Sequence, residues 1–177
     1  ESRLQEALIK IKILEDIQDI RWHFIGRIQS NKVRGIVKVF EILHSVDSFS
    51  LAERISRISG EEKRYPDIML QVKLEEDPSK GGFEVPDLLE KFPQIMDLPN
   101  IRIIGLMTIL PNGLHSLKRK SLYKKCRNLA NQLRLKDCSM GMSRDWQDAV
   151  DAGATWVRIG SELFGARPRR SNLGEDI

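Results

Sequence analysis

The stretch DCSMGMSRDWQDAVDAGATWVRIGS, residues 137–161, decides the fold. Its apolar segments at 137–141 and 155–160 have the length of buried strands, and residues 144–152 between them have the spacing of a short helix. Two strands joined by a helical crossover run parallel in the same sheet. The stretch therefore predicts one strand–helix–strand unit of a parallel α/β protein.

The same alternation extends from this unit to the start of the chain. Amphipathic helices are predicted at about 4–19, 30–38, 49–59, 84–96 and 116–133. Short apolar strands are predicted at 22–26, 42–46, 67–73 and 101–107. With the two strands of the first unit, the pattern predicts a parallel sheet of about six strands, whose crossovers are right-handed.

Such a chain fits either an open doubly wound sheet or an incomplete (β/α)8 barrel of the TIM type. The first strand-to-helix turn lacks the GxGxxG sequence expected of a dinucleotide-binding sheet, which favours the barrel. Polar and glycine residues also gather at the C-terminal ends of the strands, the rim on which a barrel builds its site. They are Gly26, Gln29 to Asn31, His44, Ser45, Thr108, Ser139 to Ser143, Gly160 and Ser161.

A complete barrel needs at least about 200 residues, and this chain has 177. It opens directly in a helical pattern without methionine, so we expect two strand–helix units to be missing from the front. The expected organisation is one barrel domain over residues 1–167 followed by a flexible charged tail over 168–177.

The composition excludes several classes of function. A net charge of +4 and an even mixture of both signs do not predict a nucleic-acid groove. The two cysteines, Cys126 and Cys138, form no CxxC pair and indicate neither a zinc site nor a disulfide framework. No apolar run reaches the roughly 18–20 residues of a membrane span. We expect a cytoplasmic protein.

Small residues at two neighbouring strand ends indicate a phosphate site. Glycine in 139–143 lets an anion approach the backbone, the hydroxyl groups donate hydrogen bonds, and a helix beginning at Ser143 or Arg144 would direct free N–H groups at the anion. Alternatively, Ser143 only caps that helix and Gly160 only permits a tight turn. Arg158 is either a partner of the bound anion or a surface residue of its strand.

Five motifs, in the same order along the chain, resemble those of the YggS/PROSC family of proteins that bind pyridoxal 5'-phosphate (PLP). The resemblance extends over about Glu1 to Arg167, and it departs at Ser2, where asparagine is common in the family. The motifs are WHFIGRIQSNK at 22–32, LHSVDS at 43–48, PSKGGF at 78–83, RIIGLMTI at 102–109, and SMGMS at 139–143 with VRIGSELFGAR at 157–167.

The resemblance implies an alanine-racemase-like barrel that holds PLP with its phosphate at the last two strand ends. An arginine beside the ring nitrogen would leave that nitrogen unprotonated, which suits storage better than turnover. We therefore expect PLP binding, buffering and delivery to apo-enzymes by a monomeric full-length parent without catalytic activity; a PLP-dependent amino-acid racemase is the alternative. The implied cofactor-binding residues are Ser139, Met140, Gly141, Ser143, Arg158, Ile159 and Gly160.

The family's PLP-bearing lysine lies on the first barrel strand, so the resemblance implies that this chain lacks the Schiff-base lysine and has no catalytic residue. Lys10, Lys12 and Lys32 fall in predicted helices and are expected to be solvated. Lys80 follows the strand expected at 67–73 and is kept as a second lysine near the mouth of the site. His23 and His44 are expected to be packed and hydrogen-bonded rather than catalytic.

Overall fold

The computed structural model of the protein describes residues 1–77 and 80–165. Its sheet has six strands, and each neighbouring pair is parallel in the order β1-β2-β3-β4-β5-β6. The strands are β1 His23–Phe24, β2 Ile42–Val46, β3 Asp67–Gln71, β4 Arg102–Met107, β5 Asp137–Met142 and β6 Trp156–Arg158. A doubly wound sheet would reverse its strand order at a switch point. The sequential order therefore confirms the incomplete barrel.

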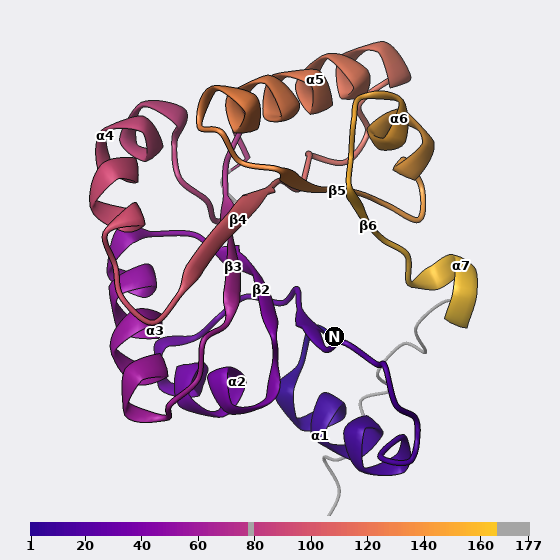
Figure 1. Cartoon of the computed structure of the whole chain (residues 1–177). Helices are drawn as coiled ribbons and strands as arrows, with labels where there is room; N and C mark the ends of the chain where they lie inside the picture. Colours follow the sequence, from indigo (N-terminus) through magenta and orange to yellow (C-terminus); the bar gives the residue numbers. More distant parts are fainter. Residues whose placement is uncertain (78–79, 166–177) are drawn as a thin grey trace, which may run out of the picture.

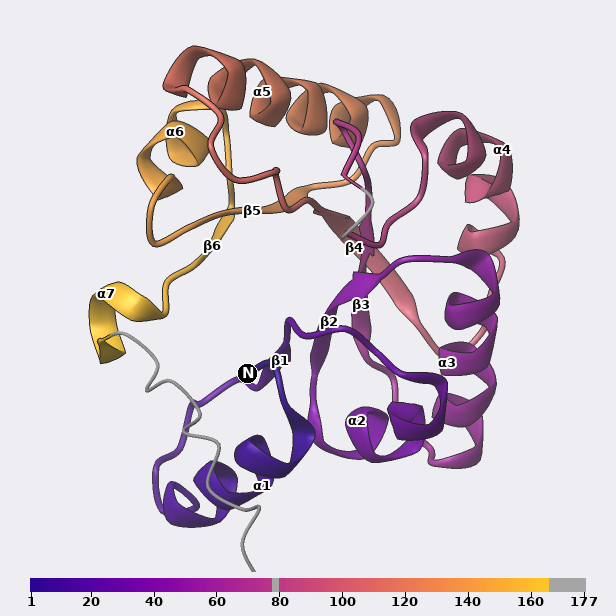
Figure 2. The same cartoon turned by 180° about the vertical axis from the view of Figure 1, so that it is seen from behind.

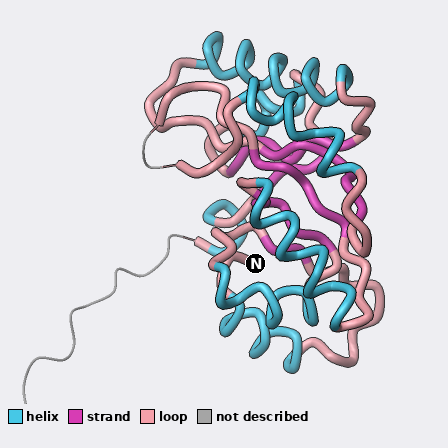
Figure 3. The backbone as a smooth tube through the Cα atoms, turned by 90° about the vertical axis from the view of Figure 1, so that its left-hand side faces the viewer, coloured by secondary structure: helices cyan, strands magenta, loops and turns pink. Residues whose placement is uncertain are grey.

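The helices lie on the convex side of the curved sheet, with α2 to α6 following one another around it (Figures 1 and 2). Viewed from the side of α3 and α4, helices lie in front of the strands (Figure 3). The helical elements are α1 Leu4–Ile13, the 3-10 helix η1 Ser30–Lys32, α2 Val33–Val39, α3 Phe49–Glu61, α4 Val85–Met96, α5 Ser116–Gln132, α6 Trp146–Asp151 and α7 Ser161–Phe164.

The side chains of the strands divide between two environments, because successive residues of a strand point to opposite faces of the sheet. One set packs with the helices in the main apolar core and includes Leu43, Ile68, Leu106, Cys138 and Met140. The alternate set faces the concave interior and includes the buried His44, Met69, Met107 and Ser139. The concave set is the more polar one, so the interior of the curved sheet is where a site is expected.

The backbone of Glu1 runs along β1 and extends the sheet on that side. The Glu1 α-amino group donates to His23 O at 2.7 Å, and Ile25 N–H donates to Glu1 O at 2.8 Å. This contact explains Gly26, because a Cβ at that position would lie 2.0 Å from the carbonyl oxygen of Ser2. The glycine that ends the WHFIG motif is thus required by close backbone packing.

Several helices and strands end earlier than the sequence predicted. The first helix ends at Ile13 instead of about residue 19, and Asp19 beyond it has a left-handed backbone with φ of 72°. Strand β3 ends at Gln71, since the next residue forms only a single bridge with Phe83. Strand β6 ends at Arg158, before the predicted residue 160. The predicted tail and the residues Pro78, Ser79 and Arg167 lie outside the described residues.

Candidate phosphate and cofactor site

The predicted site residues come together because β5 and β6 are neighbours, with Ser139 paired to Trp156 and Met142 paired to Arg158. Ser139 faces the concave interior, whereas the position that a Cβ would take on Gly141 points at α6. Met140 lies between them, and its fully buried side chain belongs to the core under the helices. Any contact of Met140 with a ligand in the interior therefore has to come from its backbone.

Gly141 has a backbone that other residues rarely adopt, with φ of +87°. A Cβ at this position would lie 2.6 Å from the Cβ of Ala149 in α6. The glycine therefore allows both the turn after β5 and the close packing of α6 beneath it.

Ser143 does not cap a helix. Its Oγ accepts a hydrogen bond from Gly160 N–H at 3.2 Å, which ties the loop after β5 to the loop after β6. The helix predicted to begin at 143 or 144 begins at Trp146 and has six residues. A Cβ on Gly160 would meet no atom within 4 Å, so the space beside this backbone is open. An anion can approach the backbone there.

Arg158 points into the barrel, so the interpretation as a surface strand residue was wrong. Its Nη1 donates to Ser139 Oγ and its Nη2 to the carbonyl oxygen of Thr108, both at 2.8 Å. Burial lowers the pKa of Arg158 to about 10, and the guanidinium stays charged at neutral pH. Among the ion pairs of the described residues, none involves Arg158. The hydrogen-bond acceptors of Arg158 are neutral, and the nearby Asp145 carboxylate makes no ion pair with it, so the partly desolvated guanidinium favours an anionic ligand.

The two histidines are packed and hydrogen-bonded, as expected. His23 Nδ1 lies 2.9 Å from His44 Nε2, and His44 Nδ1 lies 2.8 Å from Ser139 Oγ. The ring of Trp156 lies 4.9 Å from that of His23 and 6.4 Å from that of His44, measured between centroids. Burial, with smaller effects of the charges on His23 and Arg158, lowers the pKa of His44 to about 3. His44 is therefore neutral at neutral pH.

The depressed pKa of His44 makes the stability of the fold depend on pH. Below about pH 6.5 an unfolded histidine is protonated while folded His44 is not, so the free energy of unfolding falls as the pH falls toward 3. A single such group contributes at most about 1.4 kcal/mol per pH unit. We expect urea unfolding between pH 6.5 and 4 to show a steeper loss for the natural chain than for His44→Asn. If the free energy of unfolding falls equally with pH in both proteins, His44 is not held neutral in the folded state.

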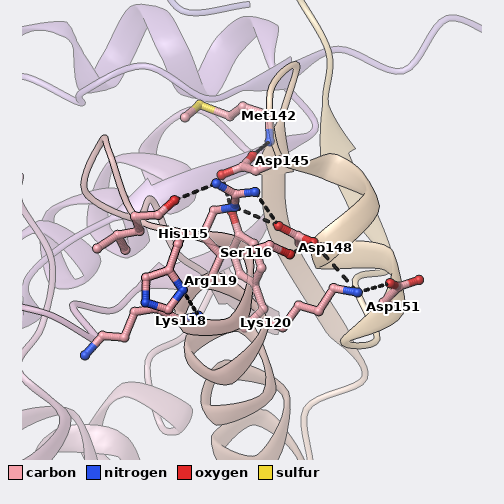
Figure 4. Close-up of polar contacts among 11 residues, drawn as sticks. His115, Ser116, Lys118, Arg119, Lys120, Met142, Asp145, Asp148 and Asp151 are labelled. Carbon is pink, nitrogen blue, oxygen red and sulfur yellow. Dashed lines mark hydrogen bonds and ion pairs between the residues drawn. The ribbon is translucent and has the colours of Figure 1, made fainter.

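Polar contacts between α5 and α6 hold the loop after β5 (Figure 4). Asp148 accepts hydrogen bonds from Ser116 Oγ and Arg119 Nε, each at 2.7 Å, and Lys120 pairs with Asp151 at 2.7 Å. These contacts fix α6 against α5, and α6 lies directly behind Gly141.

Asp145 organises the turn itself. Its carboxylate accepts hydrogen bonds from Met142 N–H at 2.7 Å and from the hydroxyl of Tyr123 at 2.8 Å. The sequence analysis did not identify either residue as part of the site. The position of Asp145 just after the SMGMS motif was a usable signal, whereas Tyr123 lies 22 positions earlier and has no local signal.

Lys10, Lys12 and Lys32 are all exposed, and Lys10 pairs with Glu1 at 2.6 Å, which confirms that these lysines are solvated. Lys80 is half-buried, and its backbone N–H donates to Asp77 O at 3.0 Å. Within residues 1–77 and 80–165, no group of three acidic, histidine or cysteine side chains is placed to hold a metal ion. In that same part of the chain, no helix is long and apolar enough to cross a membrane.

A family profile for the alanine racemase N-terminal domain matches residues 1–168. An alanine racemase of Clostridium difficile 630, solved in complex with cycloserine, has the same fold at a TM-score of 0.72 and 16% identity, over 96% of this chain and 47% of that one. The curved parallel sheet is thus that of the alanine racemase N-terminal-domain class.

Proteins named pyridoxal phosphate homeostasis protein are more similar in sequence. That of Synechocystis sp. PCC 6803 is 46% identical, over 94% of this chain and 79% of the relative, and that of Aquifex aeolicus is 38% identical, over 94% and 75%. PipY of Synechococcus elongatus PCC7942, solved with PLP bound, has a TM-score of 0.88 and 45% identity, over 93% of this chain and 80% of that one. The chain belongs to the pyridoxal phosphate homeostasis family.

Proposed function

We propose that this chain binds PLP in the concave interior of its sheet, with the phosphate at the ends of β5 and β6, and that it belongs to the machinery that buffers this cofactor. The observation that carries the proposal is Arg158, a largely desolvated cation with two neutral hydrogen-bond partners, Ser139 Oγ and Thr108 O. A doubly charged phosphate ester or an ionised ring oxygen would supply the missing negative charge.

The loops beside Arg158 fit the phosphate of the cofactor. Gly160 leaves open space next to its backbone, Ser143 provides a hydroxyl that is already joined to Gly160, and Ser139 fixes one side of the guanidinium. In this proposal Gly141, Ile159 and the backbone of Met140 also contact the phosphate. PipY, whose structure contains PLP, supports the identity of the ligand.

The proposed role is storage and delivery without turnover. PLP supplies an electron sink to enzymes that use it, and this property depends on a protonated ring nitrogen. With Arg158 beside the ring nitrogen, as the family resemblance implies, the guanidinium donates a hydrogen bond and keeps its own proton, so the arrangement suits binding rather than carbanion chemistry. Reversible binding at an open rim suits release to apo-enzymes, which we propose as partners. Racemisation of D- or L-alanine by the chain with PLP would contradict this role.

The proposal is tested by comparing PLP with pyridoxal, which lacks the phosphate, in equilibrium dialysis. Each charge-assisted hydrogen bond contributes about 1.5–3 kcal/mol, which corresponds to about tenfold to hundredfold in affinity. We expect pyridoxal to bind at least about tenfold more weakly than PLP, and inorganic phosphate to compete with PLP. Equal binding of pyridoxal and PLP would place the phosphate outside the β5–β6 loops.

A further inference from the structure

The hydrogen bonds of His44 cross the interior of the sheet. His44 lies on β2 and Ser139 on β5, and β3 and β4 lie between these strands in the sheet. The chain of contacts continues to Arg158 on β6 at one end and to His23 on β1 at the other. Four strands of the barrel thus contribute to one polar chain through its interior.

The chemistry of the groups decides which one donates and which one accepts in each of these hydrogen bonds. The guanidinium of Arg158 can only donate, so Ser139 Oγ accepts from it. The hydroxyl proton of Ser139 then needs an acceptor, because Ser139 is fully buried and an unsatisfied buried donor costs about 1–3 kcal/mol. Within the described part of the chain, the other hydrogen-bond contact of this hydroxyl is His44 Nδ1.

The ring of His44 therefore accepts at Nδ1 and carries its proton on Nε2. That proton points at His23 Nδ1, 2.9 Å away, which accepts it. All four groups are satisfied in this single arrangement, in which the hydrogen bonds run from Arg158 through Ser139 and His44 to His23. Reversing any bond would leave the hydroxyl proton of Ser139 without an acceptor.

We propose that His44 is a positioning residue, which holds the guanidinium of Arg158 toward the ligand by fixing the hydroxyl of Ser139. The inference rests on the proposed function. Arg158 has a long, flexible side chain whose ordering costs up to about 2 kcal/mol, and Ser139 and Thr108 O are the acceptors that oppose this cost. If the Ser139 hydroxyl turns away, one of the two is weakened. His44 prevents that rotation from across the barrel.

Two substitutions at His44 separate this role from simple packing. The amide of asparagine occupies the place of Nδ1 and can still accept from Ser139, whereas the amide of glutamine occupies the place of Nε2 and reaches His23 instead. Both remove the ring that contacts Trp156. A packing role predicts similar losses in both variants. The positioning role predicts that His44→Asn keeps the PLP affinity within about threefold of the natural chain and that His44→Gln loses about tenfold.

A cycle with Ser139→Ala tests whether His44 acts through the hydroxyl. We expect His44→Gln to cause little further loss of PLP affinity once Ser139 is alanine, because the two residues then act in series. Additive losses in the double variant would mean that His44 acts by another route, and would overturn the inference. Thermal unfolding of each variant, measured alongside, shows which losses merely follow stability.

A measurement without ligand separates this inference from the proposed function. Nitrogen-15 NMR reports the rotation of the Arg158 guanidinium and its hydrogen exchange in the free protein. We expect both to be slow in the natural chain and in His44→Asn, and faster in His44→Gln. Faster motion in His44→Gln together with no PLP binding by the natural chain would refute the proposed function and keep the coupling. Unchanged Arg158 signals in His44→Gln would overturn the inference even if PLP binds.

Discussion

Replacing Arg158 by methionine is expected to abolish most of the PLP affinity while leaving the fold intact. The side chains have similar volumes, but methionine is shorter, cannot donate the two hydrogen bonds to Ser139 and Thr108, and carries no charge. Loss of one or two charge-assisted bonds to the ligand, at about 1.5–3 kcal/mol each, corresponds to at least about tenfold and up to about ten-thousandfold. Equilibrium dialysis with PLP measures the loss directly.

The free energy of unfolding of the same variant should change little. Removing the half-buried guanidinium removes the cost of desolvating its charge, which offsets the cost of about 1–3 kcal/mol of leaving the buried Thr108 carbonyl oxygen without this donor. Arg158 forms no ion pair among the described residues, although the nearby Asp145 carboxylate favours its charged form, so only this weaker attraction is lost. A parallel loss of affinity and of the free energy of unfolding in Arg158→Met would contradict a binding role and indicate a structural one.

Arg158→Lys is the matched control for the geometry of the charge. Lysine keeps the positive charge but cannot make the two divergent hydrogen bonds of the guanidinium. We expect it to retain part of the affinity, between the natural chain and Arg158→Met.

The sequence was sufficient to predict that the two loops proposed to bind phosphate lie side by side. In a parallel sheet all C-terminal strand ends meet on one edge, so the segments at 139–143 and 158–161 had to be neighbours once the alternation of strands and helices was recognised. The register of Ser139 with Trp156 and of Met142 with Arg158 agrees with that reasoning.

The sequence did not show which side chains of the strands face the interior of the sheet. Strand β5 is buried on both faces, so its polarity does not reveal which residues point to the interior. Met140 was placed among the ligand contacts by the family resemblance, and its side chain lies in the core under the helices. The contact of His44 with Ser139 was equally inaccessible, since it joins residues 95 positions apart across a curved sheet.

The start of α6 also depended on a contact that sequence spacing does not show. Ser143 has the chemistry of a helix cap, but its hydroxyl is bonded to Gly160 N–H instead. The N–H of Met142 is taken by the carboxylate of Asp145, which shapes the turn and delays the helix until Trp146. A local competition among polar groups thus decided an element boundary.

Gly141→Ala is expected to lower the free energy of unfolding by about 2–5 kcal/mol, a large part of the roughly 5–15 kcal/mol that is typical of a domain. Two effects add. A left-handed backbone costs a residue with a side chain about 1–2 kcal/mol, and Gly141 has φ of +87°. Overpacking costs about 1–3 kcal/mol more, because the new Cβ would lie 2.6 Å from the Cβ of Ala149 and 3.0 Å from the Cα of Trp146.

Gly113→Ala separates the two effects. Gly113 has nearly the same φ, +81°, but a Cβ there meets no atom within 4 Å. We expect this control to lose only the backbone cost of about 1–2 kcal/mol, so the difference between the two variants in urea unfolding measures the contact between Gly141 and α6. Since α6 is held in place by the ion pairs of Asp148 and Asp151 with α5, it cannot withdraw freely from the added methyl group. Equal losses in the two variants would mean that α6 yields, and that the loop after β5 is not fixed from behind as the contacts indicate.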